Sequence, residues 1–460
     1  MNAGYPFVPR ISIDGIAWPA VPSGAASVVF GLLDQFGQSQ WWPPDLIRSF
    51  QSRQLAVLLD HAARHIPFYA SRLAEAGYRA GEGISAELWR RIPVLTRRNV
   101  QEAGRQLDSP AVPPEHGPSQ LFQTSGSTGT PIAVHRTQMA YLFWQAVTLR
   151  EHLWHERDIG AKLAVIRFDP EGHAKPPDGR LVPNWGEPTA PYYPTGPMAM
   201  LSITSTIDEQ TEWLRRHDPA YLLTHPTNLL ALARHCRAMG VRLALRGATT
   251  IGEPLTDETR AAVHDAFGVT VTDIYSTREC GYLALQCPAA THYHVQAEDV
   301  CVEVLDDDGA PCPPGATGRV VVTPLHNFAT PLIRYEVGDL AEVGGPCKCG
   351  RGLPVITRIA GRTRNMVRLR SGGLRYPGYI FSKLVEVPAV VQFQAVQRAY
   401  DRIDLDLVVR RPLTAAEEEQ IRTMIEKAIG GDLAVTIGYR DAIPRAAGGK
   451  YEEYRCEIPT

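Results

Sequence analysis

From residue 201 onward the chain alternates between helical and extended segments, and this alternation is the feature that most narrows the choice of fold. Thr206 and Glu209 have the spacing of a capping box and predict the start of a helix. An apolar stripe predicts the next helix, and its residues are Leu229, Leu232, Ala233 and Cys236. A third helix is predicted over 255–268 and a strand over 269–275. Helices and strands joined by short links predict an α/β fold in which helices cover a sheet.

The segments before residue 201 predict helices and one long loop. Apolar stripes predict helices within 50–110 and over 139–154. A short strand is predicted over 163–168. Residues 169–200 are rich in proline and glycine, so we expect a long loop on the surface.

The segments after residue 300 change in character. Short alternating runs between 300 and 343 predict a small antiparallel β subdomain near 285–350. Past Arg362 we expect a smaller α+β unit, with a strand over 403–409 and a helix capped by Thr414. The chain therefore predicts a large α/β domain over 1–361 and a small α+β domain over 362–460.

Composition limits the classes of partner. The chain has 460 residues, with 47 basic against 49 acidic side chains, and this balance gives no sign of nucleic acid or an anionic membrane as a partner. We find no apolar run of membrane-spanning length and no signal peptide. Eight cysteines are too few for a disulfide scaffold, so the sequence predicts a reducing, cytoplasmic location.

The stretch from Gln123 to Pro131 offers hydroxyl groups and glycine backbone in one loop. Such a loop can fold its N–H groups around a phosphate. No lysine follows its second glycine, so it is not the common nucleotide-binding loop. An ordinary flexible loop is the alternative that this composition also fits. The candidate phosphate-binding residues are Thr124, Ser125, Gly126, Ser127, Thr128 and Gly129.

Five further motifs follow this loop in order, and each alone also fits an ordinary surface turn. They are Ile251–Pro254, Tyr275–Glu279, Pro331–Asp339, Gly361–Arg362 and Gly449–Lys450. In this order they resemble the adenylate-forming superfamily of acyl- and aryl-CoA synthetases. The likeness is to its phenylacetate–CoA ligase-like branch, and it extends from about residue 50 to the C-terminus. The segments specific to that branch are Ile66–Tyr69, Ile92–Thr96, Cys347–Gly350 and Pro444–Tyr451.

The resemblance implies a large adenylation domain, a small mobile C-terminal domain and a two-step reaction. A carboxylate attacks the α-phosphate of ATP to give an acyl-adenylate, and a thiol or amine then displaces AMP. It implies that the loop after Gln123 holds the β- and γ-phosphates and that Glu279 helps to hold Mg²⁺. The residues implied to bind the rest of ATP are Gly252, Glu253, Pro254, Tyr275, Ser276, Thr277, Asp339 and Arg362.

The resemblance also assigns the chemical step. Lys450 would bridge the incoming carboxylate and the α-phosphate as charge grows there. The small domain would then rotate about a hinge near Arg364, where family members usually carry Asp. Ser276 replaces the usual glycine of its motif, and Arg278 is unusual at its position. Residues 370–377 are one residue longer than the branch usually shows, which puts the use of CoA in doubt.

A cysteine cluster and an acid pocket complete the candidate sites. Thiolates and one imidazole would form a closed structural zinc site, with free buried thiols as the alternative. The branch resemblance favours zinc, held by Cys287, His294, Cys347 and Cys349, and His292 is the alternative imidazole. The predicted pocket for the acid contains His225, Thr249, Thr250 and Phe143, although an aromatic residue at helical spacing also fits the core.

Three functions stay open at this point. The first is an aryl-CoA ligase acting on a hydroxy- or amino-substituted aromatic acid. The second is an adenylating ligase that passes the acyl group to an amine, a hydroxyl or a carrier thiol. The third is a non-catalytic nucleotide-binding relative, against which the presence of Glu279, Asp339 and Lys450 argues. The resemblance also allows a homodimer.

Overall fold

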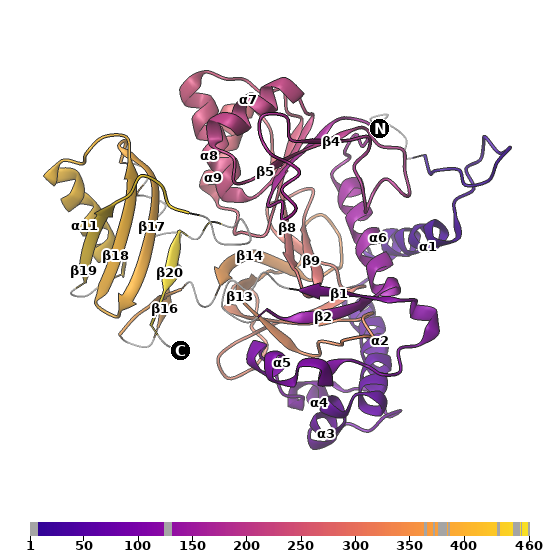
Figure 1. The fold of residues 1–460 in the computed structure, drawn as a ribbon. Coiled ribbons are helices and arrows are strands. Elements are labelled where there is room, and N and C mark those ends of the chain that lie inside the picture. The colour runs from indigo at the N-terminus through magenta and orange to yellow at the C-terminus, as the bar shows by residue number, and fades with distance from the viewer. Residues whose placement is uncertain are drawn as a thin grey trace. The chain divides into compact units, whose positions relative to one another are not determined.

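The computed structural model describes residues 8–123, 131–362, 366–370, 373–375, 384, 387–429, 433–444, 451 and 453–458 (Figure 1). The chain forms two compact units. The first comprises Met1–Val337 and Ala341–Ile359, and the second comprises Gly338–Leu340 and Ala360–Thr460. The proposed domain boundary between 361 and 362, and the mobility of the second domain, stay predictions.

Helices of the first unit lie before and between the strands of its main sheet. They are α1 (Gly24–Ser39), α2 (Pro44–His65), α3 (Pro67–Glu75), α4 (Ala86–Arg91), α5 (Arg97–Ala103), η1 (Gly104–Leu107), η2 (Pro114–His116), α6 (Gln138–Trp154), α7 (Ile207–His217), α8 (Pro226–Met239) and α9 (Asp257–Phe267). The predicted capping box is present, because the Thr206 hydroxyl accepts from the Glu209 backbone N–H while the Glu209 carboxylate accepts from that of Thr206. Proline at the first residue of α3 separates it from α2, since proline lacks the N–H that would continue the helix.

A 12-stranded sheet has the order β11-β12-β13-β14-β10-β9-β8-β7-β6-β3-β5-β4. Its strands are β3 (Leu163–Arg167), β4 (Arg180–Val182), β5 (Met198–Ser202), β6 (Tyr221–Thr224), β7 (Gly247–Ile251), β8 (Val271–Thr277), β9 (Gly281–Gln286), β10 (Tyr293–Val295), β11 (Val300–Leu305), β12 (Thr317–Pro324), β13 (Tyr335–Val343) and β14 (Val355–Arg362). The sheet contains a block of consecutive parallel strands, in the order β5, β3, β6, β7 and β8. The predicted antiparallel pairing of β11 with β12 is present, and these strands continue the main sheet.

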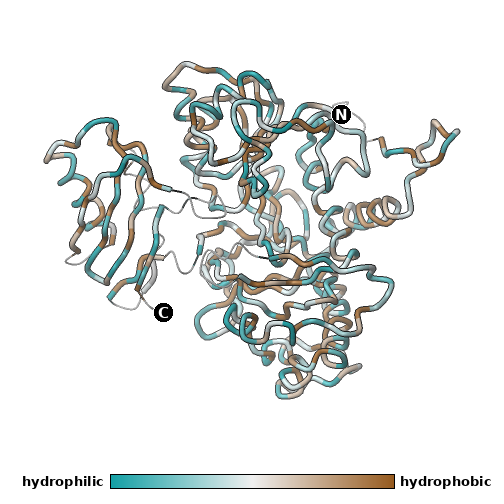
Figure 2. The backbone as a smooth tube through the Cα atoms, in the orientation of Figure 1, coloured by the Kyte–Doolittle hydropathy of each residue, from teal (hydrophilic) through white to brown (hydrophobic). Residues whose placement is uncertain are grey.

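Both faces of the parallel strands are covered by helices. Leu222 of β6 packs into a core with α7, α8 and α9, whereas Leu223 packs into a core with α1 and α6. This alternation follows from the two-residue period of a strand. Figure 2 shows hydrophobic residues along the strands of this unit. The predicted α/β class is therefore confirmed.

The predicted surface loop over 169–200 is wrong in part. These residues include β4 and the start of β5, and Trp185, Tyr192 and Tyr193 are buried. The Tyr193 ring meets Phe30 of α1 edge-on, with ring centroids 5.4 Å apart. Aromatic side chains anchor this proline-rich segment, so its composition misled the prediction. Strand β8 also begins at Val271, two residues later than predicted.

The second unit is an α+β structure with its own core. A four-stranded sheet has the order β19-β18-β17-β20, and Thr414 caps α11 through a hydroxyl that accepts from the Glu417 backbone N–H at 3.3 Å. Its elements are β15 (Val367–Arg368), β16 (Leu374–Arg375), β17 (Val390–Ala399), β18 (Arg402–Val409), α11 (Ala415–Ile429), β19 (Ala434–Tyr439) and β20 (Tyr454–Cys456). Ile421 and Ile425 of α11 are fully buried against this sheet, which confirms the predicted apolar face.

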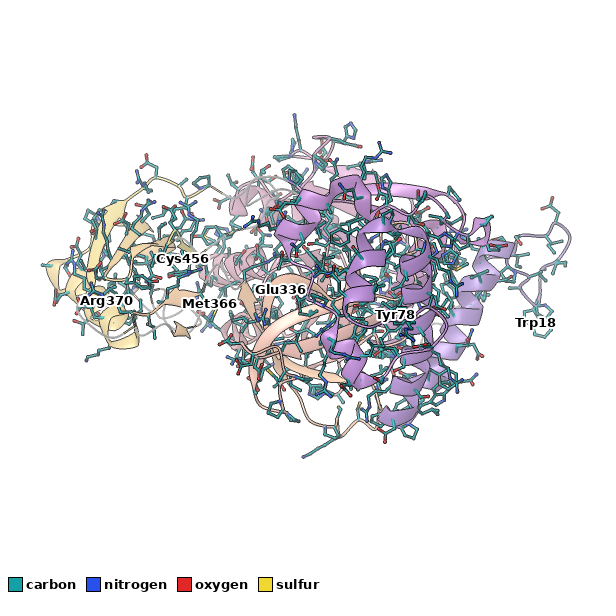
Figure 3. All side chains as sticks on the ribbon, turned by 90° about the horizontal axis from the view of Figure 1, so that it is seen from below. Trp18, Tyr78, Glu336, Met366, Arg370 and Cys456 are labelled. Atoms are coloured by element: carbon teal, nitrogen blue, oxygen red, sulfur yellow. The ribbon has the colours of Figure 1, made fainter. Side chains whose placement is uncertain are left out.

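The last two features of the fold concern hydrophobic segments and their exposure. Among the described residues, no helix combines the length and the hydrophobicity that crossing a membrane requires. Trp18 lies in the segment before α1 and projects away from the rest of the first unit, with 84% of its surface exposed (Figure 3). Single exposed apolar residues are common on soluble proteins, so Trp18 by itself carries no functional conclusion.

Candidate active site

Two of the predicted motifs and the pocket candidate His225 lie at the carboxyl ends of neighbouring parallel strands. His225 follows β6, Gly252 and Glu253 follow β7, and Thr277 ends β8. In open α/β sheets, ligands bind outside the carboxyl ends of the strands. The fold therefore brings these motifs to one edge of the sheet, as a ligand site requires.

Glu279 follows β8 and its side chain is 5% exposed. The Tyr335 hydroxyl donates a hydrogen bond to Oε1 of Glu279 at 3.1 Å, and Nη1 of Arg97 lies 4.0 Å from the same oxygen. Burial and the nearby Glu279 charge raise the pKa of Tyr335, so its hydroxyl stays protonated and available as a donor. The carboxylate is thus held in a fixed position beside a cation.

The branch segment Ile92–Thr96 places Arg97 next to Glu279. Leu95 donates from its backbone N–H to the Arg334 carbonyl at 2.8 Å and accepts from the Glu336 N–H at 2.9 Å, so this segment is bound to the start of β13. Thr96 caps α5, and Arg97 is the first residue of that helix. These two backbone hydrogen bonds therefore bring the segments that carry Arg97 and Tyr335 together beside Glu279.

The turn after β7 is fixed by its glycine and by Glu253. Gly252 has φ of +86°, a conformation that other residues adopt only with strain. The Glu253 carboxylate accepts from the Thr227 hydroxyl at 2.7 Å and from its backbone N–H at 3.2 Å, at the start of α8. Nδ1 of His225 lies 2.7 Å from the Ile251 carbonyl. Pro254 then leads away from this rigid turn.

The end of β8 forms a second tight turn. Tyr275 is 6% exposed and belongs to the core, and Ser276 is half-buried. The Thr277 hydroxyl accepts from the Cys280 N–H at 3.0 Å. The Arg278 carbonyl accepts from Nη2 of Arg136 at 3.0 Å, so the guanidinium of β2 (Ala133–Thr137) reaches this turn.

The two predicted ribose ligands are neighbours in the second unit. Nε of Arg362 donates to Oδ1 of Asp339 at 2.9 Å, and the Asp339 side chain is 8% exposed while that of Arg362 is 37% exposed. Their binding to ATP stays a prediction.

Several predicted residues lie outside the described part of the chain. They are Thr124, Ser125, Gly126, Ser127, Thr128, Gly129, Arg364 and Lys450. The strands that flank the phosphate-loop candidate are described: β1 (Ser119–Gln123) pairs antiparallel with β2, and Gln123 lies opposite Ala133.

The predicted acid-pocket residues form hydrogen bonds and ring contacts with other residues of the protein. Thr250 is fully buried and donates to Oδ1 of Asp273 at 2.5 Å, and the Thr249 hydroxyl accepts from Nη2 of Arg157 at 2.9 Å. Phe143 stacks on His326 with ring centroids 3.6 Å apart. Their contact with a substrate stays a prediction, as does that of His225.

A pocket opens beside Glu279, and most of its lining was missed from the sequence. It is lined by Arg136, Ala140, Trp144, Glu279, Cys280, Asp299, Pro324, His326 and Asn327. Burial raises the pKa of Asp299 to about 7, although Arg136 opposes that shift. Burial also lowers the pKa of His326 to about 4, so this imidazole is neutral at pH 7. Asp299 belongs to no motif, and an acid just before the buried strand β11 was the available signal.

The predicted cysteine cluster is brought together by the fold. The ligand atoms of Cys287, His294, Cys347 and Cys349 all lie within 4.8 Å of one another. The Cys287 and Cys347 sulfurs are 3.8 Å apart, and Nε2 of His294 lies 3.3 Å from the Cys349 sulfur. Nε2 of His292 also lies 3.0 Å from the Cys347 sulfur, so the alternative imidazole stays open. None of the eight cysteines forms a disulfide.

The cluster is bound to the corner between α1 and α2. Arg351 lies between two indole rings, 4.7 Å from the Trp41 centroid and 4.5 Å from that of Trp154. Gly352 approaches this corner so closely that a Cβ there would lie 1.8 Å from the Trp42 carbonyl oxygen. A group that held the cysteines would therefore also hold the N-terminal helices.

Two family descriptions match the chain. Residues 50–328 match the family described as AMP-binding enzyme, and residues 376–454 match the one described as CapK C-terminal domain. The first match alone covers more than half of the chain.

Curated relatives match over most of the chain. A phenylacetate–coenzyme A ligase of Thermus thermophilus is 26% identical over 89% of this chain and 96% of that protein. The enzyme of the same name from Escherichia coli is 24% identical over 88% of this chain and 93% of that protein.

A solved structure has a similar fold. A 2-hydroxyisobutyryl-CoA ligase in the postadenylation state, in complex with 2-HIB-AMP, has a TM-score of 0.71 and 20% identity, and the match covers 91% of each chain. At this identity the likeness concerns the fold alone.

Proposed function

The chain belongs to the AMP-binding enzyme family, and on that premise we propose that it is an AMP-forming ligase that joins a carboxylic acid to the thiol of CoA. In the first step, a carboxylate oxygen forms a bond to the α-phosphorus of ATP, and the bond to the β-phosphate oxygen breaks, so pyrophosphate leaves. In the second step, the thiol sulfur attacks the acyl carbonyl, AMP leaves, and the thiol proton passes to solvent. The likeness to phenylacetate–coenzyme A ligases over 89% of the chain supports this assignment.

The main structural support for this proposal is the arrangement of side chains around Glu279. Tyr335 and Arg97 hold one carboxylate at the ligand edge of the sheet, where it fits the role of a Mg²⁺ ligand. Bound Mg²⁺ would neutralise charge on the phosphates. Arg97 lies within 4.0 Å of that carboxylate and would add a second positive charge near the same phosphates.

Other residues would bind the remainder of ATP. By its likeness to the family motif, the rigid turn at Gly252 would lie along the adenine, where backbone without a side chain lets the flat base approach. Asp339 would accept from the ribose hydroxyls, with Arg362 beside it. The loop residues Thr124 to Gly129 would donate to the phosphates.

We assign the cysteine cluster as a structural zinc site. Three thiolates and one imidazole make a complete tetrahedral set, which leaves no position for a substrate. The backbone N–H of Ala289 donates to the Cys287 sulfur and that of Cys349 to the Cys347 sulfur, as donors to thiolate ligands do. Zinc would hold the loop that packs against Trp41.

The preferred acid is a hydroxy- or amino-substituted aromatic acid. Curated relatives act on phenylacetate by name, which supports an aromatic ring. Trp144 lines the pocket beside Glu279 and offers a flat apolar surface of the kind on which such a ring packs.

The test is product analysis with a lysine variant. Purified protein is incubated with ATP, Mg²⁺, aromatic acids and either CoA or hydroxylamine, while pyrophosphate and acyl products are followed. We expect Lys450→Ala to lower pyrophosphate release by ~10³-fold with ATP binding retained, because an ammonium that stabilises transition-state charge contributes several kcal/mol. Lys427→Ala, an exposed lysine on α11, is the control and should leave the rate unchanged.

The acyl product identifies the acceptor. A CoA thioester supports the proposal. Pyrophosphate release without a thioester would instead mean that an amine, a hydroxyl or a carrier thiol accepts the acyl group, and no release with any acid would mean a non-catalytic nucleotide-binding protein.

A further inference from the structure

Asp299 contributes an unpaired carboxylate to the pocket beside Glu279. Within the described part of the chain, its side chain makes no hydrogen bond and no ion pair, although its backbone N–H bonds the Gln296 carbonyl. Glu298, the preceding residue, differs in this respect, because its carboxylate is bound by Arg150 at 2.8 Å and by the Ser39 hydroxyl at 2.6 Å. Asp299 is only partly buried, so its carboxylate remains open to a donor that enters the pocket.

Arg136 and Trp144 complete the pocket wall on the other side. A Cβ on Gly281 would lie 3.7 Å from both Nη2 of Arg136 and Cδ1 of Trp144, so these side chains from β2 and α6 meet over β9. The Arg136 guanidinium lies 4.9 Å from the Phe122 ring and donates to a backbone carbonyl, and it forms no ion pair within the described residues.

The remaining polar groups of the pocket are already satisfied. Nδ2 of Asn327 donates to the carbonyls of His135 and Thr330, and its Oδ1 accepts from the Ala329 N–H. Nε2 of His326 donates to the Glu298 carbonyl at 2.8 Å. Apart from Glu279, which is assigned to Mg²⁺, Asp299 is therefore an acceptor that a ligand can still use among the described residues of this pocket.

We propose that Asp299 is a specificity-determining residue, and that its carboxylate accepts a hydrogen bond from an amino or hydroxyl group carried by the carboxylic acid substrate. This inference rests on the proposed ligase function, because Glu279 lines the same pocket and would place the acid next to ATP. Trp144 lies against the apolar body of the acid, and the positive charge of Arg136 favours the ionised form of the Asp299 carboxylate. An acid without a donor group leaves Asp299 unpaired and binds less well.

The experiment compares acids that differ only in the donor group. Benzoate and its amino and hydroxy derivatives at each ring position are tested with wild type, Asp299→Asn, Asp299→Ala and the exposed-turn control Asp307→Asn. Binding is measured by calorimetry without ATP, and kcat/KM is measured by pyrophosphate release. Thermal melting identifies any variant that is not folded.

We expect Asp299→Ala to lose the preference of wild type for acids that carry an amino or hydroxyl group. Wild type should favour at least one amino or hydroxy derivative over benzoate by ~10-fold or more, because a hydrogen bond to a charged group is worth about 1.5–3 kcal/mol. In Asp299→Ala the ratio should fall towards one while benzoate itself changes less than about threefold, and Asp307→Asn should behave as wild type.

Two results would overturn the inference. The first is that wild type binds benzoate as tightly as every derivative and uses it with the same kcat/KM. The other is a preference that survives in both Asp299 variants. If no acid releases pyrophosphate, the ligase proposal fails, and the calorimetric ratio still decides whether Asp299 recognises the donor group.

Discussion

The first unit contains two polar sites of opposite kinds. At Cys287, His294, Cys347 and Cys349, the donor atoms lie within 4.8 Å of one another and form a closed set. In the pocket beside Glu279, Asp299 and Arg136 face a common space without an ion pair among the described residues. A closed set of ligands stabilises the fold, whereas unpaired charges in a pocket lower stability and gain their partner from a ligand.

The difference extends to the neighbours of each site. The cysteine loop is bound to the α1–α2 corner through Arg351, which lies between Trp41 and Trp154. Glu279 is instead placed by Tyr335 and Arg97, whose contacts orient one carboxylate towards the ligand edge of the sheet. Substitutions at the closed site should therefore change stability, and substitutions at the open pocket should change catalysis.

The largest expected effect comes from neutralising Glu279. Glu279→Gln should lower pyrophosphate release by ~10²-fold or more, because an amide binds Mg²⁺ more weakly than a carboxylate while Tyr335 can still donate to its oxygen. The melting temperature should change by only a few degrees. Glu342→Gln, which alters an ion pair with the exposed Arg358, is the matched control. A rate within fivefold of wild type would remove Glu279 from the metal site.

A smaller effect, on stability rather than on catalysis, is expected at the cysteine cluster. Cys349→Ser should lower the zinc content of purified protein, measured by mass spectrometry, and reduce unfolding free energy by about 2–5 kcal/mol, because metal binding contributes to folding. Cys312→Ser, a partly exposed cysteine outside the cluster, should retain full zinc content. The acid preference of the folded fraction should be that of wild type. Zinc-free wild-type protein with unchanged stability would contradict the comparison.

Per pH unit, the smallest effect is a pH dependence of stability due to Asp299. Burial raises its pKa to about 7 in the folded chain from an ordinary value of 3.8, so the folded state holds the proton more tightly than the unfolded state. Its contribution to stability is therefore present below pH 4 and is lost as the pH rises through 7. The free energy of unfolding of wild type relative to Asp299→Asn should fall by up to about 1.4 kcal/mol per pH unit in that window.

Melting curves of the two proteins at matched pH values between 4 and 8 give this difference. A constant difference across the range would mean that Asp299 is paired in solution, and the contrast with the cysteine cluster would then disappear.

Local patterns predicted the elements well, because their signals lie within a few residues. Thr206 with Glu209, and Thr414 with Glu417, cap helices as their spacing predicts. The cysteine cluster was also predicted, since Cys347 and Cys349 are separated by a single residue and the branch resemblance supplied the two partners. The buried aromatic residues of 169–200 were missed, because composition does not show that Tyr193 packs on α1.

The pocket beside Glu279 could not be predicted from local patterns. Arg136, Glu279 and Asp299 line one pocket only because β2, the turn between β8 and β9, and the segment before β11 come together in the folded unit. Such a juxtaposition depends on long-range strand pairing, and no single stretch of sequence carries its signal. The resemblance identified Glu279, but the other two residues belong to none of the quoted motifs.

Acid-dependent exchange of labelled pyrophosphate into ATP tests the central claim most directly, because it reports the reversible formation of an acyl-adenylate without any acceptor. We predict exchange that requires both Mg²⁺ and a substituted aromatic acid in wild type and that is nearly absent in Glu279→Gln and Lys450→Ala. The account would be contradicted if a broad panel of carboxylic acids gave no exchange, or if the exchange were equal with and without an acid.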